Sequence, residues 1–238
     1  MKTRLCLLFA ALAASLAAAE PSASGVSADE ALAQLREGNA RFVHATASRP
    51  HQDAARRAAL AGGQQPYAVV LSCSDSRVPP EIVFDQGIGD LFVIRVAGNV
   101  AGVTETATVE YGALHLRAPL CVVLGHANCG AVTAAVEGGP LEGNLPALIG
   151  AVEPAAKRAH ELQPKATGSA LVAVAVETNV WLSIETLFSR SEPLRALVAS
   201  GRLRVVGAVY DLASGEVHWL GAHPEQARLL ESAEKKTP

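Results

Sequence analysis

The sequence predicts an α/β fold with a mostly parallel central β-sheet, flanking helices and an antiparallel hairpin at one edge. Short apolar runs recur along the chain, and each has the length and composition of a strand buried on both faces. Segments with helical character separate these runs, and that alternation is typical of βαβ units around a parallel sheet. The turn Ser214-Gly215 then leads from the last run into an antiparallel partner at 216–220.

The first helix is expected to run from Ser27 to about Val43, because Ser27 and Glu30 form a capping box. A second helix is expected from about 52 to 60, where Gly62-Gly63 stops it. The buried strands are expected at 67–72 (YAVVLS), 90–96 (DLFVIRV), 119–124 (PLCVVL) and 203–210 (LRVVGAVY). Further helices are expected at 104–116, 130–136, 145–162 and 171–189.

Composition places the protein among ordinary globular chains. The 238 residues are 50% apolar and 18% charged, which is enough apolar material for the core of one domain and too much for long disorder. The formal net charge of −3 lacks the basic surplus of nucleic-acid-binding proteins, so no nucleic acid is expected as a partner. The four cysteines are too few for a disulfide-dense class.

Residues 1–19 have the pattern of a secretory signal peptide. Lys2 and Arg4 precede an uncharged apolar run at 5–18, and the small residues 17–19 form a cleavage site. An uncleaved membrane anchor is the alternative, but the run is shorter than the roughly 20 residues that a span needs. We therefore expect export to the periplasm and no membrane contact in the mature form. The rest is expected to comprise a short linker at 20–26, a single domain at 27–222 and a polar C-terminal tail at 223–238.

The four cysteines are expected to have different fates. Cys6 is removed with the signal peptide, and Cys121 lies inside an apolar strand, where it is expected to be a small core residue. Three cysteines therefore remain in the exported chain, and an odd number cannot all pair within one molecule. Cys73 and Cys129 are left as candidates for a disulfide or for metal ligation.

Two polar segments follow two of the predicted strands. Cys73-Ser-Asp75-Ser-Arg77 comes directly after the strand at 67–72, and Gly125-His126-Ala-Asn-Cys129-Gly130 comes directly after the strand at 119–124. The carboxyl ends of parallel strands form the ligand-binding edge of such sheets, so both segments are expected to meet there. Two thiolates and an imidazole suit zinc, and three protein ligands leave a fourth position open, as in catalytic sites. The N-terminus of the helix at 130–136 would also favour the thiolate of Cys129.

Asp75 and Arg77 indicate how such a site could work. A carboxylate two residues beyond a ligand can reach the metal or a water bound to it, and Arg77 can hold that carboxylate by charge-assisted hydrogen bonds. Paired with Arg77, Asp75 would accept a hydrogen bond from a zinc-bound hydroxide and orient it. Moved onto the metal, Asp75 would instead close the fourth position. A disulfide between Cys73 and Cys129 would leave this pair and His126 without a role.

These motifs resemble those of the β-class carbonic anhydrases. The CxDxR and HxxC patterns at this separation are specific together, whereas CxDxR alone would be a weak signal. The similarity extends over about residues 27–221. The other similar segments are 35–42 (LREGNARF), 92–99 (FVIRVAGN), 110–116 (EYGALHL), and, in the closing hairpin, 207–212 (GAVYDL), Gly215 and Trp219-Leu220.

The resemblance implies a fold of the β-carbonic anhydrase type and a zinc lyase, with one zinc ion per subunit. Such an enzyme converts carbon dioxide reversibly to bicarbonate and a proton, with a zinc-bound hydroxide as the attacking group and the Asp75–Arg77 pair orienting it. In the family a neighbouring subunit contributes a Gln to an apolar substrate pocket, which implies a homodimer or homotetramer. The residues carried over are the zinc ligands Cys73, His126 and Cys129, the catalytic pair Asp75 and Arg77, and the substrate-binding residues Gln64, Phe92, Tyr111 and Gly130.

One departure from the family pattern bears on the state of the site. Some members bind bicarbonate at a regulatory site with a Trp three residues before the first Cys ligand, and here that position is Val70. We therefore expect an open site with Asp75 turned toward Arg77. Two other functions remain open at this point: a hydrolase acting on carbon disulfide or carbonyl sulfide, and a zinc protein without catalysis. The Asp75–Arg77 pair and the three rather than four ligands argue against the second.

Overall fold

The computed structural model describes residues 23–231. The signal peptide predicted at 1–19 lies outside the described residues, as do residues 20–22 of the predicted linker and residues 232–238 of the predicted tail.

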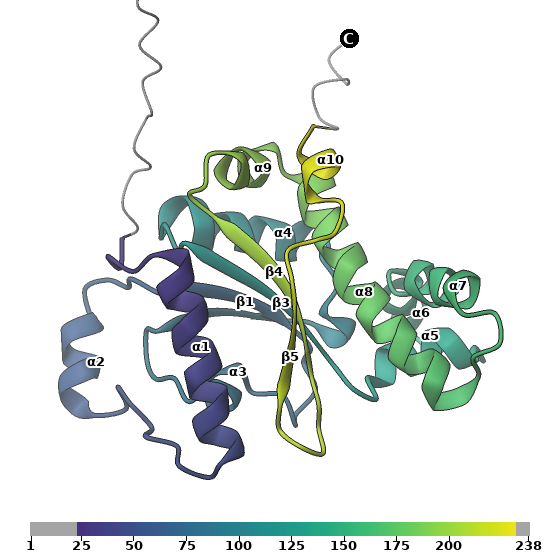
Figure 1. Ribbon diagram of the computed structural model, residues 1–238, viewed down its shortest axis with the longest axis horizontal. Helices are drawn as coiled ribbons and strands as arrows, with labels where there is room; N and C mark the ends of the chain where they lie inside the picture. Colours follow the sequence, from purple (N-terminus) through teal and green to yellow (C-terminus); the bar gives the residue numbers. More distant parts are fainter. Residues whose placement is uncertain (1–22, 232–238) are drawn as a thin grey trace, which may run out of the picture.

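The strands are β1 (Ala68–Ser72), β2 (Leu91–Arg95), β3 (Leu120–His126), β4 (Arg204–Tyr210) and β5 (Val217–Gly221). They form one five-stranded sheet at the centre of the domain, in the order β2-β1-β3-β4-β5 (Figure 1). Neighbouring strands are parallel except for β4 and β5, which are antiparallel. The predicted fold class, a mostly parallel sheet with an antiparallel edge hairpin, is confirmed.

Helices connect the strands and cover both faces of the sheet (Figure 1). The α-helices are α1 (Ala28–Val43), α2 (Ala54–Leu60), α3 (Pro80–Val83), α4 (Val103–Glu110), α5 (Gly130–Glu137), α6 (Leu145–Gly150), α7 (Glu153–Leu162), α8 (Gly168–Arg190), α9 (Glu192–Ala199) and α10 (Gln226–Glu231). Two short segments complete the list, the 3₁₀ turn η1 (Ala97–Asn99) and the π-helical turn η2 (Tyr111–His115).

Each face of the sheet packs against a different set of helices. Val70 of β1 lies in the apolar cluster that contains Leu35 of α1, whereas its neighbour Leu71 lies in the cluster that contains Ile184 of α8. All four side chains are fully buried. Successive residues of a strand point to opposite faces, so β1 needs apolar residues throughout. This double burial explains the continuous apolar runs in the sequence.

The capping box predicted at the start of α1 is present. The Glu30 N–H donates to Ser27 Oγ at 3.2 Å, and the Ser27 N–H donates to Glu30 Oε2 at 2.8 Å. These bonds satisfy backbone donors that the first turn of a helix leaves free. The side chains of Ala31, Leu32 and Leu35 then face the sheet and are buried.

Several helices differ from their predicted extents. The segment predicted as one helix at 104–116 is α4 followed by η2. The segment at 145–162 is divided into α6 and α7, and Pro154 stands in the first turn of α7, where its missing N–H costs nothing. The helix α9 was not predicted; it begins where Ser191 Oγ accepts a hydrogen bond from the Leu194 N–H. The helix α10 occupies part of the segment expected as a polar tail.

The helix α8 is long and apolar enough, by length and composition, to cross a membrane. In this protein 61% of that stretch is buried, and the helix packs against β3 and β4. The helices α5 and α7 lie beside it (Figure 1). Its apolar composition is therefore accounted for by its place in the core.

Candidate metal centre

The carboxyl ends of β1 and β3 bring three ligand-type side chains together. Cys73 directly follows β1, His126 is the last residue of β3, and Cys129 is the N-cap of α5. The two strands are parallel neighbours with Ser72 opposite Leu124, so their ends meet at one edge of the sheet. The ligand atoms of the three side chains all lie within 4.8 Å of one another, and all three residues are buried. Within residues 23–231 this is the group suited to holding a metal ion.

The geometry around His126 fits a bound metal. The side chain is fully buried, and its Nε2 has no hydrogen-bond partner in the described part of the chain. Its Nδ1 lies 2.9 Å from the carbonyl oxygen of Ala127, which makes Nδ1 the protonated nitrogen and leaves the lone pair on Nε2. A buried acceptor without a partner is costly, and a metal ion would satisfy it. Together with two sulfur ligands, this nitrogen forms a set typical of zinc.

The two thiols share a buried hydrogen bond. Their Sγ atoms are 4.0 Å apart, well beyond the roughly 2.05 Å of a disulfide, and both cysteines are free. The contact with Cys129 lowers the pKa of Cys73 to about 4, and the His126 side chain and the Gly98 N–H add to the effect. The same contact raises the pKa of Cys129, because one proton serves both sulfur atoms. The pair is thus ready to supply the thiolate that a metal ligand requires.

Cys121 stands apart from this cluster. It lies in β3 with no exposed surface, and burial raises the pKa of its thiol to about 12. A thiol that stays protonated in an apolar core is neither a ligand nor a nucleophile.

Asp75 faces Arg77, the orientation expected for a chain with Val70. Arg77 donates from Nε to Oδ1 of Asp75 at 2.9 Å and from Nη2 to Oδ2 at 2.7 Å, and its backbone N–H also donates to Oδ1 at 2.9 Å. These hydrogen bonds hold the pKa of the Asp75 carboxyl well below its usual range. Asp75 is therefore ionised at any physiological pH and acts as an acceptor only.

Arg95 supports the loop that carries these residues. Its guanidinium donates from Nε to the carbonyl of Cys73 at 3.0 Å and from Nη2 to the carbonyl of Asp75 at 2.6 Å. A second donor from outside the loop, the N–H of Gly98, points at Cys73 Sγ at 3.3 Å. The contacts of Arg95 and of Gly98 with Cys73 could not be predicted from the sequence, because they join segments 22 and 25 residues apart.

The residues expected in the substrate pocket do not all lie at the metal ligands of the same chain. Phe92 and Tyr111 are close together, with ring centroids 5.9 Å apart. Phe92 pairs with Val69, however, which lies four residues before Cys73, or about 13 Å along the strand. Gln64 precedes β1 and is exposed at the opposite end of the strand from Cys73.

Gly130 lies beside the ligands, as the first residue of α5 directly after Cys129. A Cβ at this position would meet no heavy atom within 4 Å, so the space in front of it is open. The backbone at the start of α5 is therefore accessible to a small ligand.

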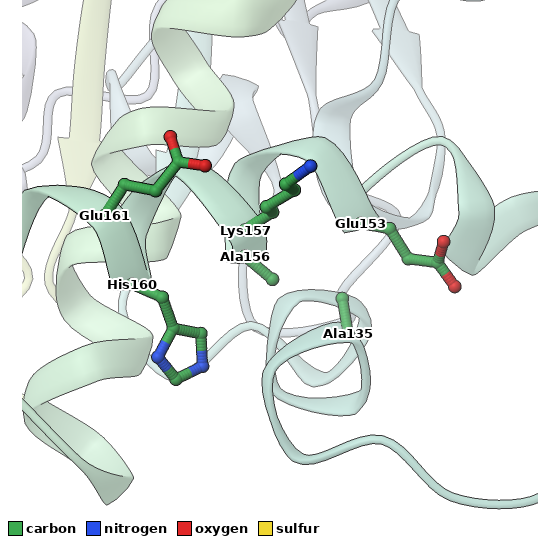
Figure 2. A pocket seen from close by; sticks show the side chains of 6 residues that line it. All are labelled: Ala135, Glu153, Ala156, Lys157, His160 and Glu161. Atoms are coloured by element: carbon green, nitrogen blue, oxygen red, sulfur yellow. The ribbon is translucent and has the colours of Figure 1, made fainter. Parts of the chain in front are cut away.

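A separate hollow of about 510 Å³ lies between α5 and α7 (Figure 2). Its lining residues are Ala135, Glu153, Ala156, Lys157, His160 and Glu161. Figure 2 shows the polar side chains pointing in different directions rather than toward a common point. Because a binding site needs converging polar groups, this hollow is a weaker candidate than the Cys73 cluster.

The chain is similar to carbonic anhydrases, both by a family model and by comparison with curated proteins. A family model described as carbonic anhydrase matches residues 68–217. Carbonic anhydrase 2 of Mycobacterium tuberculosis is 40% identical over 183 residues, which cover 76% of this chain and 87% of the relative. A carbonic anhydrase of Pseudomonas aeruginosa is 37% identical over 186 residues, covering 74% and 83% of the two chains.

Solved structures show the same similarity. A structure reported as one of two tetrameric β-carbonic anhydrases from Sordaria macrospora matches with a TM-score of 0.65 and 28% identity, covering 80% of this chain and 96% of that one. The β-carbonic anhydrase CafA of Aspergillus fumigatus matches with a TM-score of 0.66 and 29% identity, covering 86% and 95%. Both similarities extend over nearly the whole of those chains.

Proposed function

Because the chain belongs to the β-class carbonic anhydrase family and catalyses the reversible hydration of carbon dioxide with zinc, we propose roles for its site residues, its assembly and its location. The observation that carries the mechanism is the buried cluster of Cys73, His126 and Cys129 beside a carboxylate that Arg77 holds. Cys73, Cys129 and Nε2 of His126 are the ligands in this proposal. When bound, zinc lowers the pKa of water toward neutrality and so supplies the attacking oxygen.

Asp75 orients the attacking oxygen in this proposal. Its Oδ2 lies 3.8 Å from Nε2 of His126, so this oxygen faces the ligand cluster. Both carboxylate oxygens already accept hydrogen bonds from Arg77. An ionised carboxylate has further lone pairs, so Asp75 can also accept a hydrogen bond from a group bound at the Cys73, His126 and Cys129 cluster. By accepting that bond, Asp75 would hold the donor oxygen in one fixed orientation. Holding a group in a reactive orientation in this way lowers the barrier without new chemistry.

We propose that the active unit is a homo-oligomer of at least two subunits, whose substrate pocket is completed across the interface. Phe92, Tyr111 and Gln64 lie away from the ligands of their own chain, and β2, which carries Phe92, is an edge strand of the sheet. Tyr111, whose ring packs against Phe92, is 48% exposed, and Ile88, three residues before β2, is 42% exposed. Leu114, in the same turn η2 as Tyr111, is 38% exposed. An unpaired edge flanked by apolar side chains is a surface that folded proteins normally cover. The tetrameric relatives from Sordaria macrospora support such an assembly.

We also propose that the enzyme is exported to the periplasm. The support is the sequence pattern of residues 1–19, with its basic start, apolar run and small-residue cleavage site. Mass spectrometry of the protein recovered from the periplasmic fraction should find a mature N-terminus at Glu20. A chain that keeps residues 1–19 and stays with the membrane would contradict this.

The catalytic proposal is tested by stopped-flow measurement of carbon dioxide hydration on zinc-loaded protein. Replacing Cys73 by Ala should remove both the bound zinc and the activity. The matched control is Cys121→Ala, which also removes a buried thiol but one outside the cluster. Activity that survives Cys73→Ala would rule out this metal centre.

A further inference from the structure

The sulfur of Cys73 has a hydrogen-bond donor that comes from another part of the chain. The N–H of Gly98, in the turn η1, points at Cys73 Sγ at 3.3 Å, and both residues are buried. Gly98 has a φ of +75°, and a Cβ there would lie 3.0 Å from Val152 and 3.3 Å from Ala131. Only glycine suits both the backbone conformation and the available space. The direction of this N–H therefore depends on how the turn is held.

Two polar side chains of α8 hold the turn. Asn179 donates from Nδ2 to the carbonyl of Gly98 at 2.6 Å, and Ser183 donates from Oγ to the carbonyl of Asn99 at 3.0 Å. The two residues are one helical turn apart, on the same face of α8, and are only 2% and 4% exposed. Their neighbours on this buried part of the helix include the apolar residues Val180 and Ile184. Asn179 and Ser183 differ from them in donating hydrogen bonds to two consecutive carbonyls of the turn η1.

We propose that Asn179 and Ser183 are positioning residues of the metal centre, which aim the Gly98 N–H at the sulfur of Cys73 and so set how tightly the site retains zinc. This inference rests on the zinc site of the proposed function. A hydrogen bond to a ligand sulfur withdraws charge from it and restrains its position, and such outer contacts tune both the electronic properties and the affinity of metal sites. Asn179 and Ser183 bond to the turn and lie outside the cluster of Cys73, His126 and Cys129, so they act through the turn.

The test compares three single variants of the zinc-loaded enzyme. Asn179→Ala and Ser183→Ala each remove one donor to the turn. The matched control is Thr178→Val on the same helix, because Thr178 is 5% exposed and its hydroxyl donates to the carbonyl of Val174 in its own helix at 2.8 Å. Ser183→Ala leaves the side-chain volume nearly unchanged, so this variant still tests the positioning role if Asn179→Ala does not fold.

Two readouts separate a positioning role from a loss of stability. The first is the rate at which zinc passes to a coloured chelator, which should rise about tenfold in both test variants. The second is the thiolate-to-metal absorption band of the cobalt-substituted protein, which should move to longer wavelength because a sulfur with a weaker hydrogen bond gives up charge more easily. Thr178→Val should leave both readouts at the parent's values.

Parent-like zinc transfer and cobalt spectra in Ser183→Ala would overturn the proposal, and so would equal changes in Thr178→Val. These outcomes leave the carbonic anhydrase mechanism intact. A parent enzyme that itself retains no zinc would overturn the metal centre and this proposal together.

Discussion

Oδ2 of Asp75 lies 3.8 Å from Nε2 of His126, the nitrogen that has no other partner in the described chain. The same Oδ2 accepts a hydrogen bond from Arg77 at 2.7 Å, so the carboxylate stands between the guanidinium and the ligand cluster. The paired hydrogen bonds from Arg77 thereby restrain Asp75 at this position.

Arg77→Ala should lower the maximal rate of carbon dioxide hydration by about a hundredfold, because an unrestrained Asp75 no longer holds the attacking oxygen and is free to move onto the zinc. Stopped-flow kinetics on zinc-loaded protein measures this. Arg77→Lys should recover only part of the loss, since an ammonium group cannot make the paired bonds. Arg158→Ala serves as the control, because Arg158 pairs with Glu185 away from the cluster. An unchanged rate in Arg77→Ala would show that Asp75 needs no partner.

Removing zinc in air should lead to a disulfide bond between Cys73 and Cys129. Their sulfur atoms are 4.0 Å apart, and the hydrogen bond from Cys129 lowers the pKa of Cys73, which favours the thiolate that disulfide formation requires. The two thiols would lose two electrons and two protons to oxygen. After chelation and aerobic storage of protein lacking residues 1–19, and with them Cys6, thiol titration under denaturing conditions should find only Cys121. Zinc should restore activity only after a reductant is added. Recovery with zinc alone would contradict this, and chelation under argon is the control.

Acid should weaken the fold in part through Asp85, whose side chain is 1% exposed. Burial alone would raise the pKa of this carboxyl, but hydrogen bonds from Arg41, Ser48 and Arg49 outweigh it and lower the pKa to about 2. The folded-state pKa is below the unfolded value of about 3.9, so the stabilisation is complete above pH 5 and is lost as the pH falls toward 2. It amounts to about 2 kcal/mol.

Asp85→Asn should therefore lower the free energy of unfolding at pH 7 by about 2 kcal/mol and bring the two proteins closer together at pH 2.5. Urea unfolding at both pH values measures the difference, and zinc loss at low pH, which is common to both proteins, cancels from it. Asp29→Asn, at a side chain that is 88% exposed, is the control. A difference that does not shrink in acid would mean that the Asp85 carboxylate does not carry this stability.

Leu114→Glu should separate the subunits and abolish activity together. Leu114 is 38% exposed in η2, the turn whose Tyr111 packs against Phe92 of β2, and a charge there would be costly to bury in an interface. The isolated subunit would lack Phe92, Tyr111 and Gln64 at its metal ligands. Sedimentation and stopped-flow kinetics measure the two effects. The control, Leu162→Glu, also places a charge at an exposed leucine, but on α7. A fully active monomer would refute the shared pocket.

The clustering of Cys73, His126 and Cys129 was predictable because its signals are local. Cys73 follows one strand and His126 ends the next strand in the sheet, and in parallel strands those ends must meet at one edge. The apolar runs predicted the strands for a similar reason, since burial on both faces leaves a continuous pattern. Boundaries were less well determined: β3 continues to His126 because pairing with β4 extends that far, and a strand's pairing partner is not visible in its own residues.

The sequence by itself therefore determined the fold class, the cluster of Cys73, His126 and Cys129, and the Asp75–Arg77 pair. The apolar runs and the two polar segments behind these predictions are each local patterns of a few consecutive residues. Only the tertiary structure decided what surrounds them. The Gly98 N–H reaches Cys73 across 25 residues of chain, and Asn179 and Ser183 reach the turn η1 across 81 and 84 residues. The placement of Phe92 away from its own Cys73 follows from strand register. Such contacts depend on how helices pack over the sheet, and no short-range pattern records that geometry.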